Sequence, residues 1–264
     1  MLFENYQSIL VERRGRLVYA TLNRPEMLNC INAELDYEIM RLFWELDQDT
    51  ESDAMVITGA GRAFSAGGDI EYMKETLKPG MFAEGIKRGK KILNGILSCD
   101  KPIIARVNGD AVGLGATIAL FCDIVIADET ARIADPHVHV GLAAGDGGAV
   151  IWPQLIGFAR AKRYLLGGER ITGRDAADIG LIAFAVPKEE LDAKVQEWVD
   201  KFTVNSASVA VKYTKTAINL QLQGVLNSLV DAGFAYEAMT AGTQDHAEAV
   251  EAFAAKRKPK FIGK

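Results

Sequence analysis

Cysteine is scarce in this sequence, and its three copies, Cys30, Cys99 and Cys122, show no spacing typical of a disulfide framework or a metal site. An odd number of cysteines in a chain without a recognisable secretion signal predicts reduced thiols. Residues 1–10 carry acidic and polar side chains in place of a basic segment and an apolar run, so we expect no secretory signal. No apolar run reaches the roughly 20 residues that span a bilayer.

Positive charge is also in short supply. The chain has 30 Lys and Arg against 35 Asp and Glu, which gives a net charge of -5. A nucleic-acid-binding surface needs clustered Lys and Arg to contact phosphates, and here the basic residues are dispersed except near the C-terminus. The sequence therefore predicts a soluble, cytoplasmic protein with neither a nucleic-acid nor a membrane partner.

Apolar residues, in contrast, make up 49% of the 264 residues, enough for a sizeable core. Strand-like and helix-like segments alternate along most of the chain, which indicates the α/β class. The expected strands are 9–11 and 17–22, joined as a hairpin at Arg14-Gly15, then 54–58, 103–107, 123–127 and 131–134; the expected helices are 32–46, 81–97 and 116–121.

The pattern changes beyond Pro187, where long helices are expected over 189–202, 206–222 and 227–240. This change predicts a boundary near residue 200, with a compact core over 1–200 and a helical region over 201–264. The last helices carry apolar residues that one core does not obviously cover: Ile218, Leu222, Val225, Leu226 and Leu229. Such residues predict self-association.

Two glycine-rich turns, each placed between a strand and a helix, are the first candidates for chemistry. The first is Ala63-Phe64-Ser65-Ala66-Gly67-Gly68-Asp69-Ile70, and the second spans 108–117. Glycine lets a ligand approach the backbone, and a helix start leaves N–H groups without partners. Two such turns can each direct one N–H at a single carbonyl oxygen, which would build an oxyanion hole. A plain tight turn would use the same residues.

Arg24, in Leu22-Asn23-Arg24-Pro25, has two interpretations. A strand that leads into Arg-Pro and a helix is typical of a structural turn. Alternatively, the guanidinium reaches a phosphate of a ligand.

In their order and spacing these segments resemble the crotonase, or enoyl-CoA hydratase/isomerase, superfamily over essentially the whole chain. The matching pieces are residues 22–25 with Asn29 and Asn32, then 63–69, 108–123, 131–136, 147–148, 252–253 and 256–261. The resemblance implies a spiral of ββα units followed by a helical trimerisation region, and hence a homotrimer or a dimer of trimers. It implies no tightly bound cofactor, because coenzyme A enters as part of the thioester substrate.

The resemblance also implies roles for individual residues. The thioester carbonyl would lie between the backbone N–H groups of Gly68 and Leu114, where it is polarised as an enolate forms. The implied contacts to coenzyme A, with its adenine against residues 62–66 and its phosphates near the C-terminal lysines, are Arg24, Arg62, Ala63, Phe64, Ala66, Asp69, Ile70, Lys256 and Lys260.

The sequence departs from the family where hydratases place two glutamates around a water. In this chain those two positions are Thr117 and His137. A threonine hydroxyl is not a base near neutral pH, so hydration by a glutamate pair is not supported. Imidazole titrates near neutrality and can serve as a general acid or base, so His137 becomes the main candidate.

Two neighbours of His137 complete the candidate site. Asp146, between glycines, can orient the imidazole and stabilise its cation, as a buried carboxylate does in a triad, although a turn aspartate is the structural alternative. His139 is expected to be structural. We expect a crotonase-fold acyl-CoA enzyme of the enoyl-CoA hydratase/isomerase type, with His137, Asp146 and Thr117 at its catalytic centre.

Residues 135–153 are also similar to 6-oxocamphor hydrolase, a branch in which Pro-His, Gly-Asp-Gly and Trp-Pro support cleavage of a cyclic β-diketone. That similarity carries over His137 and Asp146 but not the further histidine of that enzyme, since none lies between Asn108 and Asp123. The alternatives are therefore a carbon-carbon hydrolase that uses a His137-activated water, and a catalytically idle CoA-binding subunit. The loop at 66–69 and the basic tail favour a CoA thioester.

Overall fold

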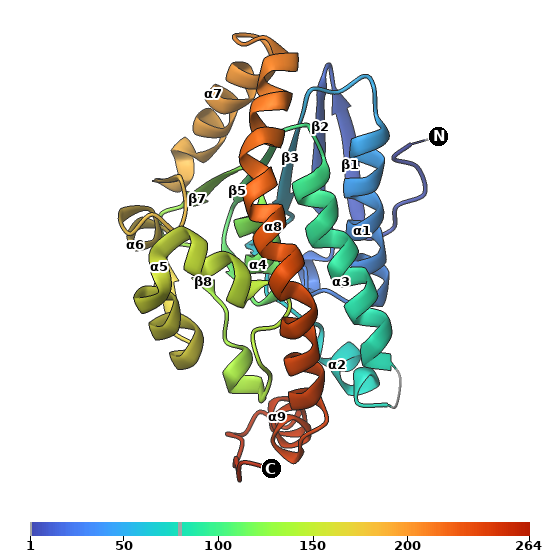
Figure 1. Cartoon of the computed structure of the whole chain (residues 1–264), viewed down its shortest axis with the longest axis vertical. Helices are drawn as coiled ribbons and strands as arrows, with labels where there is room; N and C mark the ends of the chain where they lie inside the picture. Colours follow the sequence, from blue (N-terminus) through green and yellow to red (C-terminus); the bar gives the residue numbers. More distant parts are fainter. Residues whose placement is uncertain (1, 79–80) are drawn as a thin grey trace.

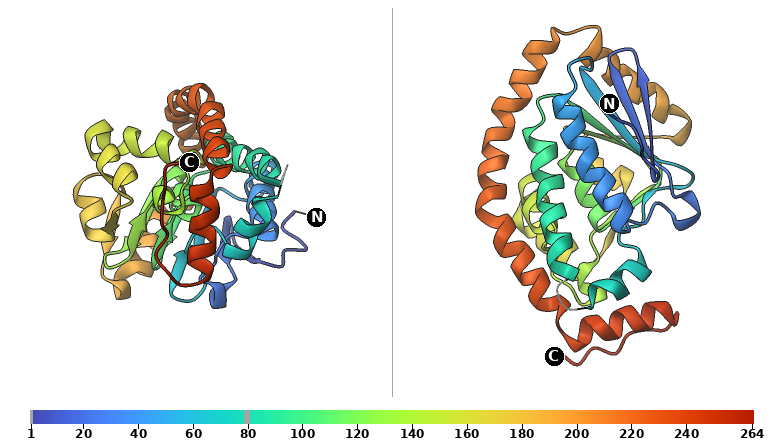
Figure 2. Two further views of the ribbon diagram at one scale, coloured as in Figure 1. Left: turned by 90° about the horizontal axis from the view of Figure 1, so that it is seen from below. Right: turned by 90° about the vertical axis from the view of Figure 1, so that its right-hand side faces the viewer.

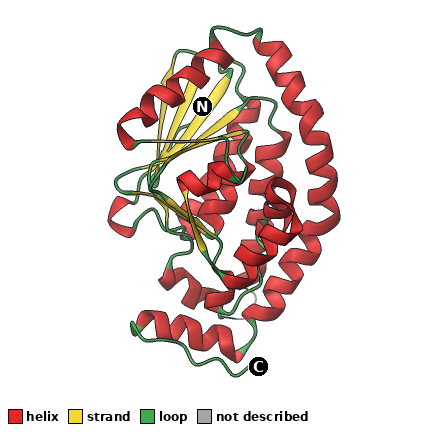
Figure 3. Cartoon of the chain, turned by 90° about the vertical axis from the view of Figure 1, so that its left-hand side faces the viewer, coloured by secondary structure: helices red, strands yellow, loops and turns green. Residues whose placement is uncertain are grey.

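The computed structural model describes residues 2–78 and 81–264, and its strands form two sheets (Figures 1 and 3). The six-stranded sheet has the order β1 (Ile9–Arg14), β2 (Leu17–Leu22), β3 (Ala54–Gly59), β5 (Ile103–Val107), β7 (Ile124–Asp128) and β10 (Phe184–Val186). The four-stranded sheet has the order β4 (Ala63–Ser65), β6 (Asp110–Val112), β8 (Arg132–Ala134) and β9 (Arg170–Thr172).

One structural unit repeats along the chain. In each of the pairs β3/β4, β5/β6 and β7/β8, the first strand joins the large sheet and the second joins the small sheet. Helices follow each pair: α2 (Ile70–Thr76) and α3 (Met81–Ser98), then α4 (Leu114–Phe121), then α5 (Gly148–Gly167). The prediction of an α/β spiral of ββα units is confirmed.

The large sheet is covered on both faces. Except for the β1/β2 hairpin, which closes at Arg14 and Leu17, its strands are parallel. Helix α1 (Ala33–Gln48) and α3 pack into the main core on one face, and α7 (Leu191–Thr203) covers the other face through Leu191, Val195 and Val199. Strand β3 is buried along its whole length, as expected for a parallel strand between two layers.

Most expected elements occur within a few residues of their predicted bounds. Helix α1 begins at Ala33, and Asn32 caps it, because its side chain accepts a hydrogen bond from the N–H of Leu35. The prediction of two helices over 206–222 and 227–240 is wrong: α8 is continuous from Ser208 to Ala241. Gly224 lies inside it, where the packing of α8 against α3 and α5 outweighs the weak helix propensity of glycine.

The C-terminal helices lie against the spiral. Helix α8 runs along α3, and α9 (Gln244–Ala254) crosses the end of the molecule next to α2 (Figure 2). Leu226 is fully buried, and Leu222 and Val225 pack against the main core, so for these residues the expectation of an uncovered face is wrong. Ile218 and Leu229 are exposed, together with Tyr213, Leu220, Tyr236 and Met239. Self-association and the boundary near residue 200 stay predictions.

The chain contains short connecting elements as well: 3-10 turns over Pro25–Met27, His137–Val140 and Lys188–Glu190, and helix α6 (Gly173–Asp178). Across residues 2–78 and 81–264, no helix combines the length and the apolar character that crossing a membrane requires.

Candidate active site

A cavity of about 660 Å³ lies where the two glycine turns, the segment after β8 and the C-terminal helices meet. One wall comes from Gly67, Gly68, Gly113 and Leu114. The cavity is also lined by four titratable residues: His137, Asp146, Glu237 and His246. Apolar side chains from α8 and α9 complete the lining, among them Phe234, Val250 and Phe253. The spiral and the C-terminal helices thus enclose one space.

The glycine turns lie side by side because their glycines allow it. Gly67 has φ +90°, and a Cβ there would lie 2.9 Å from the carbonyl oxygen of Val112. Gly113 has φ +54°, and a Cβ there would lie 3.8 Å from Cε1 of His137. An L side chain at either position would therefore be strained or would occupy the cavity.

Two backbone N–H groups at these turns are unengaged. Within the described ranges, neither the N–H of Gly68 nor that of Leu114 donates to a protein acceptor, whereas Asp69 donates to Ile31 and Gly113 to Ala134. Leu114 begins α4, so its N–H has no intrahelical partner. Both residues line the cavity.

His137 lies between two carboxylates. Its Nδ1 contacts Oδ1 of the fully buried Asp135, and its Nε2 is 3.4 Å from Oδ2 of Asp146. Burial lowers the pKa of His137, but the negative charges of Asp135 and Asp146 outweigh burial and raise that pKa well above its usual value. Nδ1 donates to Asp135, since a carboxylate only accepts hydrogen bonds, whereas Nε2 faces Asp146 without a hydrogen bond to any described residue. The two carboxylates favour the imidazolium form of the ring.

Asp146 connects His137 to the predicted Thr117. Its Oδ1 accepts hydrogen bonds from Thr117 Oγ1 at 3.3 Å and from the N–H of Gly148 at 3.4 Å. Burial raises the pKa of Asp146, and the charge of His137 opposes that shift. Thr117 is fully buried, and its hydrogen bond to Asp146 connects it to His137. The structure thus brings the three predicted residues together.

Sequence reasoning gave Asp135 no role, although it holds the far side of the imidazole. A residue before a proline usually indicates only an extended or turn conformation. Here Pro136 begins the 3-10 turn at His137–Val140, which directs the ring of His137 back to the carboxylate of Asp135. His139 is exposed and packs against Gly168, in agreement with the expected structural role.

Two further titratable residues at the cavity were missed. Glu237 on α8 is buried, and its Oε2 has no hydrogen-bond partner in the described part of the chain. His246 on α9 is buried and donates from Nδ1 to the carbonyl oxygen of Val140 at 2.7 Å. Burial lowers the pKa of His246, so this imidazole is neutral at pH 7 while that of His137 is charged. Both lie about 100 residues beyond His137 in the sequence, in segments whose helical pattern indicates no site.

The predicted coenzyme A contacts divide into two groups. Arg62, Ala63, Ala66 and Ile70 line the cavity. The others do not: Phe64 is fully buried in the core, and Lys256 and Lys260 lie in the tail after α9. The guanidinium of Arg24 lies 3.1 Å from Oδ2 of Asp69, and the Asp69 side chain also caps α2. Both side chains are therefore occupied by contacts within the protein. Arg132 and Arg170, absent from the prediction, line the cavity.

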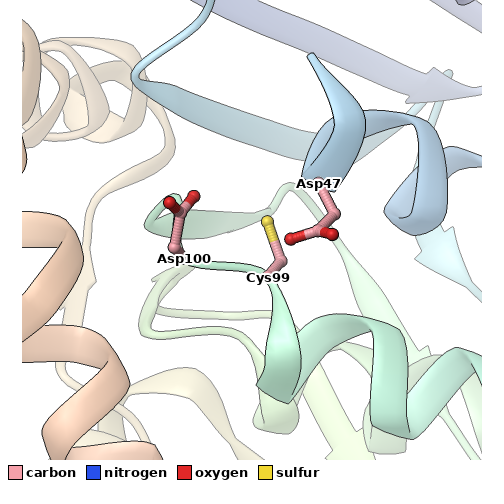
Figure 4. A group of neighbouring side chains, drawn as sticks. All are labelled: Asp47, Cys99 and Asp100. Atoms are coloured by element: carbon pink, nitrogen blue, oxygen red, sulfur yellow. The ribbon is translucent and has the colours of Figure 1, made fainter. Parts of the chain in front are cut away.

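A second acidic group lies far from this cavity and has a simpler explanation. Asp47, Cys99 and Asp100 come together where α1 and α3 end (Figure 4). The Nζ of Lys101 lies 3.2 Å from the carbonyl oxygen of Asp47 and 3.2 Å from Oδ1 of Asp100. The ammonium group of Lys101 thus pairs with the Asp100 carboxylate, and the Asp47 carboxylate accepts a hydrogen bond from Nε2 of Gln48 at 3.0 Å. Burial raises the pKa of Cys99 to about 11, so the thiol is protonated and a poor ligand.

Known proteins are similar to this chain in sequence and in structure. The family model described as enoyl-CoA hydratase/isomerase matches residues 12–264. A short-chain-enoyl-CoA hydratase of Clostridium acetobutylicum is 36% identical, over 95% of this chain and 96% of the relative. A crotonyl-CoA hydratase of Syntrophomonas wolfei is 33% identical, over 98% of this chain and 99% of the relative.

Solved structures show the same similarity. An enoyl-CoA hydratase/isomerase from Mycobacterium paratuberculosis has a TM-score of 0.89 and 37% sequence identity, and the match covers 94% of this chain and 99% of that one. The expected fold class is confirmed by this match.

Proposed function

The chain belongs to the enoyl-CoA hydratase/isomerase family, and on that premise we propose that it transfers a proton to or from the acyl group of a coenzyme A thioester through His137. The observation that carries the proposal is the position of His137, at the cavity wall between Asp135 and Asp146. Two carboxylates around one imidazole favour a ring that holds its proton and returns to the charged state after each transfer.

The thioester carbonyl would bind at the two glycine turns. Gly68 and Leu114, whose N–H groups have no acceptor among the described residues, line the same cavity as His137. A Cβ added at Gly113, next to Leu114, would lie 3.8 Å from Cε1 of His137. As the α-carbon gives its proton to the Asp146 carboxylate, which lines the same cavity, negative charge develops on the carbonyl oxygen, and two N–H donors would stabilise that charge. Removing one such donor typically costs about 3 kcal/mol of barrier. The proposal places the enolate between this hole and the imidazolium.

The proton itself would move at Nε2 of His137. In the resting state this nitrogen lies 3.4 Å from Oδ2 of Asp146 without a hydrogen bond, so its N–H is available to a reacting carbon. Asp135 stays on Nδ1 and fixes the ring orientation throughout. When Nε2 gives its proton to the enolate carbon, the ring becomes neutral, and the proton that Asp146 took from the α-carbon would return to Nε2, which restores both groups. Isomerisation and the protonation step of carbon-carbon cleavage both need this transfer.

Hydration through two glutamates is not part of the proposal. The positions that hydratases of this superfamily give to glutamate hold Thr117 and His137, and Thr117 donates its hydroxyl hydrogen bond to Asp146. Neither side chain can act as the carboxylate that activates water.

A carbon-carbon hydrolase acting on a β-diketone remains the second candidate, and one observation favours it. The similarity to 6-oxocamphor hydrolase lacked a further histidine, yet His246 lines the cavity in its neutral form. With Nδ1 donating to Val140, its Nε2 carries a lone pair that can accept a proton from water. The contrast between a charged His137 and a neutral His246 is the arrangement expected of an acid and a base.

Coenzyme A binding would use Arg62, Ala63, Ala66 and Ile70, since these line the cavity. Contacts of the phosphates with Lys256 and Lys260, from the same or another subunit, stay predictions, as do the trimer and the cytoplasmic location. The idle CoA-binding subunit is the alternative that predicts binding without turnover.

Incubation with a panel of acyl-CoA and diketone compounds, followed by mass spectrometry, tests the proposal. The panel holds enoyl-CoA, 3-oxoacyl-CoA and cyclic diketone compounds, with and without deuterated water. We expect deuterium exchange at the α-carbon of an acyl-CoA, with isomerisation or cleavage of the chain, and loss of exchange in His137→Ala. Gain of water with an intact skeleton would contradict the proposal, and so would ring opening of the diketone alone. Binding without exchange would identify the idle subunit.

A further inference from the structure

Glu237 is a buried acid at the cavity that the proton transfer does not use. Its residue is 7% exposed, it lines the same cavity as His137 and Asp146, and Oε2 lacks a hydrogen-bond partner among the described residues. A buried polar atom without a partner is costly, so a native structure that keeps one commonly reserves it for a ligand or water.

The backbone fixes Glu237 in this place. A Cβ on Gly145 would lie 2.1 Å from the carbonyl oxygen of Gly233 and 2.7 Å from Cβ of Glu237, so glycine at 145 allows α8 to approach the loop before α5. One turn further along α8, Thr240 Oγ1 accepts a hydrogen bond from the N–H of Ala143 at 3.0 Å. The acid is therefore held against the Asp146 loop on both sides.

The surroundings favour the protonated form of this acid. Burial and the negative charge of Asp146 raise the pKa of Glu237 to about 8, with Asp135 adding to that rise and His137 opposing it. A protonated carboxyl offers one O–H donor together with a carbonyl acceptor. Nearby walls of the cavity are apolar, with Phe234, Val250 and Phe253 from the same two C-terminal helices. A saturated acyl chain would leave the O–H of Glu237 unpaired against them.

We propose that Glu237 is a specificity-determining residue that donates a hydrogen bond to a second oxygen on the acyl group, so that the substrates are acyl-CoA thioesters with a keto or hydroxyl oxygen beyond the thioester carbonyl. The inference rests on the proposed function. Because Glu237 lines the same cavity as His137 and Asp146, the oxygen that it contacts would lie near the carbons where the proton moves, as in a 3-oxoacyl group. Sites built to pair a substrate oxygen discriminate against analogues that lack it.

Calorimetric titration with acetoacetyl-CoA and butanoyl-CoA tests this inference, because the two esters share a four-carbon chain and differ in the 3-keto oxygen. We expect the wild-type protein to bind acetoacetyl-CoA more tightly by roughly tenfold or more. Glu237→Met should abolish that preference by weakening acetoacetyl-CoA alone. Glu237→Gln, which keeps a donor and an acceptor, should retain most of it. Glu189→Gln, at an exposed position before α7, is the matched control and should behave as wild type.

The results of this titration test the role of Glu237 and the proposed function separately. Equal binding of both esters by the wild-type protein, or an unchanged preference in Glu237→Met, would overturn the role of Glu237 and leave the proposed function standing. Parallel weakening of both esters in Glu237→Met, with a lowered unfolding midpoint, would show that Glu237 is only structural. Failure of both esters to bind the wild-type protein would refute the proposed function itself.

Discussion

Asp135→Asn should move the pH at which the protein loses activity. Asp135 is fully buried and contacts Nδ1 of His137, while its Oδ2 packs against the backbone of Gly148. Asparagine has nearly the same shape, so the substitution removes a charge and little volume. An opposite charge within about 4–6 Å typically shifts a pKa by 1–3 units. We therefore expect the pKa of His137 to fall in the variant, because one of the two carboxylates that raise it has lost its charge.

The sign of the effect follows from the proton that His137 carries. The raised pKa keeps the wild-type ring charged through neutral pH, so activity that needs the imidazolium is lost only as the pH rises through that raised pKa. In Asp135→Asn the alkaline limb of the rate profile should lie at lower pH. The charged ring also contributes stability that is fully present below the unfolded-state pKa of about 6.5 and disappears as the pH rises through the folded-state value. That contribution should shrink in the variant.

Nitrogen-15 NMR of the histidine rings, paired with the pH dependence of turnover, measures both quantities. Asp192→Asn is a suitable control, because Asp192 pairs with Arg106 and its side chain is 81% exposed. The control variant should leave both the alkaline limb of the rate profile and the titration of His137 unchanged. If Asp135→Asn also left them unchanged in a folded protein, the two-carboxylate explanation of the charged ring would be refuted.

Three further predictions concern other parts of the molecule. Gly68→Pro removes the proposed oxyanion donor, so turnover should fall by about 10²-fold or more in a folded variant, measured by steady-state kinetics. Lys215→Met should destabilise the protein by about 3–5 kcal/mol in urea unfolding, since the buried ammonium is 2.8 Å from Asp123 and would leave that carboxylate unpaired. Sedimentation should show trimers or dimers of trimers at micromolar concentration, because α8 exposes Tyr213 and Leu220; a stable monomer would contradict this.

Much of the fold follows from local sequence pattern. Strand β5 occurs at its predicted residues, and Asn32 caps α1, because alternation, apolar runs and capping are properties of short segments. The continuity of α8 was not predictable from Gly224, since helix packing decides it. Leu226 likewise appears in the sequence as one residue of an apolar stripe, and only the position of α3 shows that it is buried.

In the candidate site, too, local sequence pattern predicts some residues and only packing reveals the others. His137 and Asp146 lie nine positions apart within one segment, and in the structure Nε2 of His137 is 3.4 Å from Oδ2 of Asp146. Glu237 and His246 reach the cavity only because α8 and α9 fold back over the spiral. Their sequence neighbours are ordinary helix residues, so no local signal distinguishes them. The sequence therefore did not predict Glu237 and His246 as site residues, because only long-range packing brings them to the cavity.

The central claim is that His137 is the proton donor at a thioester site, and His137→Ala tests it most directly. Turnover of the preferred acyl-CoA should fall by about 10²–10⁴-fold, the usual contribution of a positioned acid or base. Binding of the same ester should change little, since Gly68, Leu114 and Arg62 are untouched. His139→Ala, at an exposed position two residues away, should keep full activity. Full turnover in His137→Ala would contradict the account and assign the chemistry to another group.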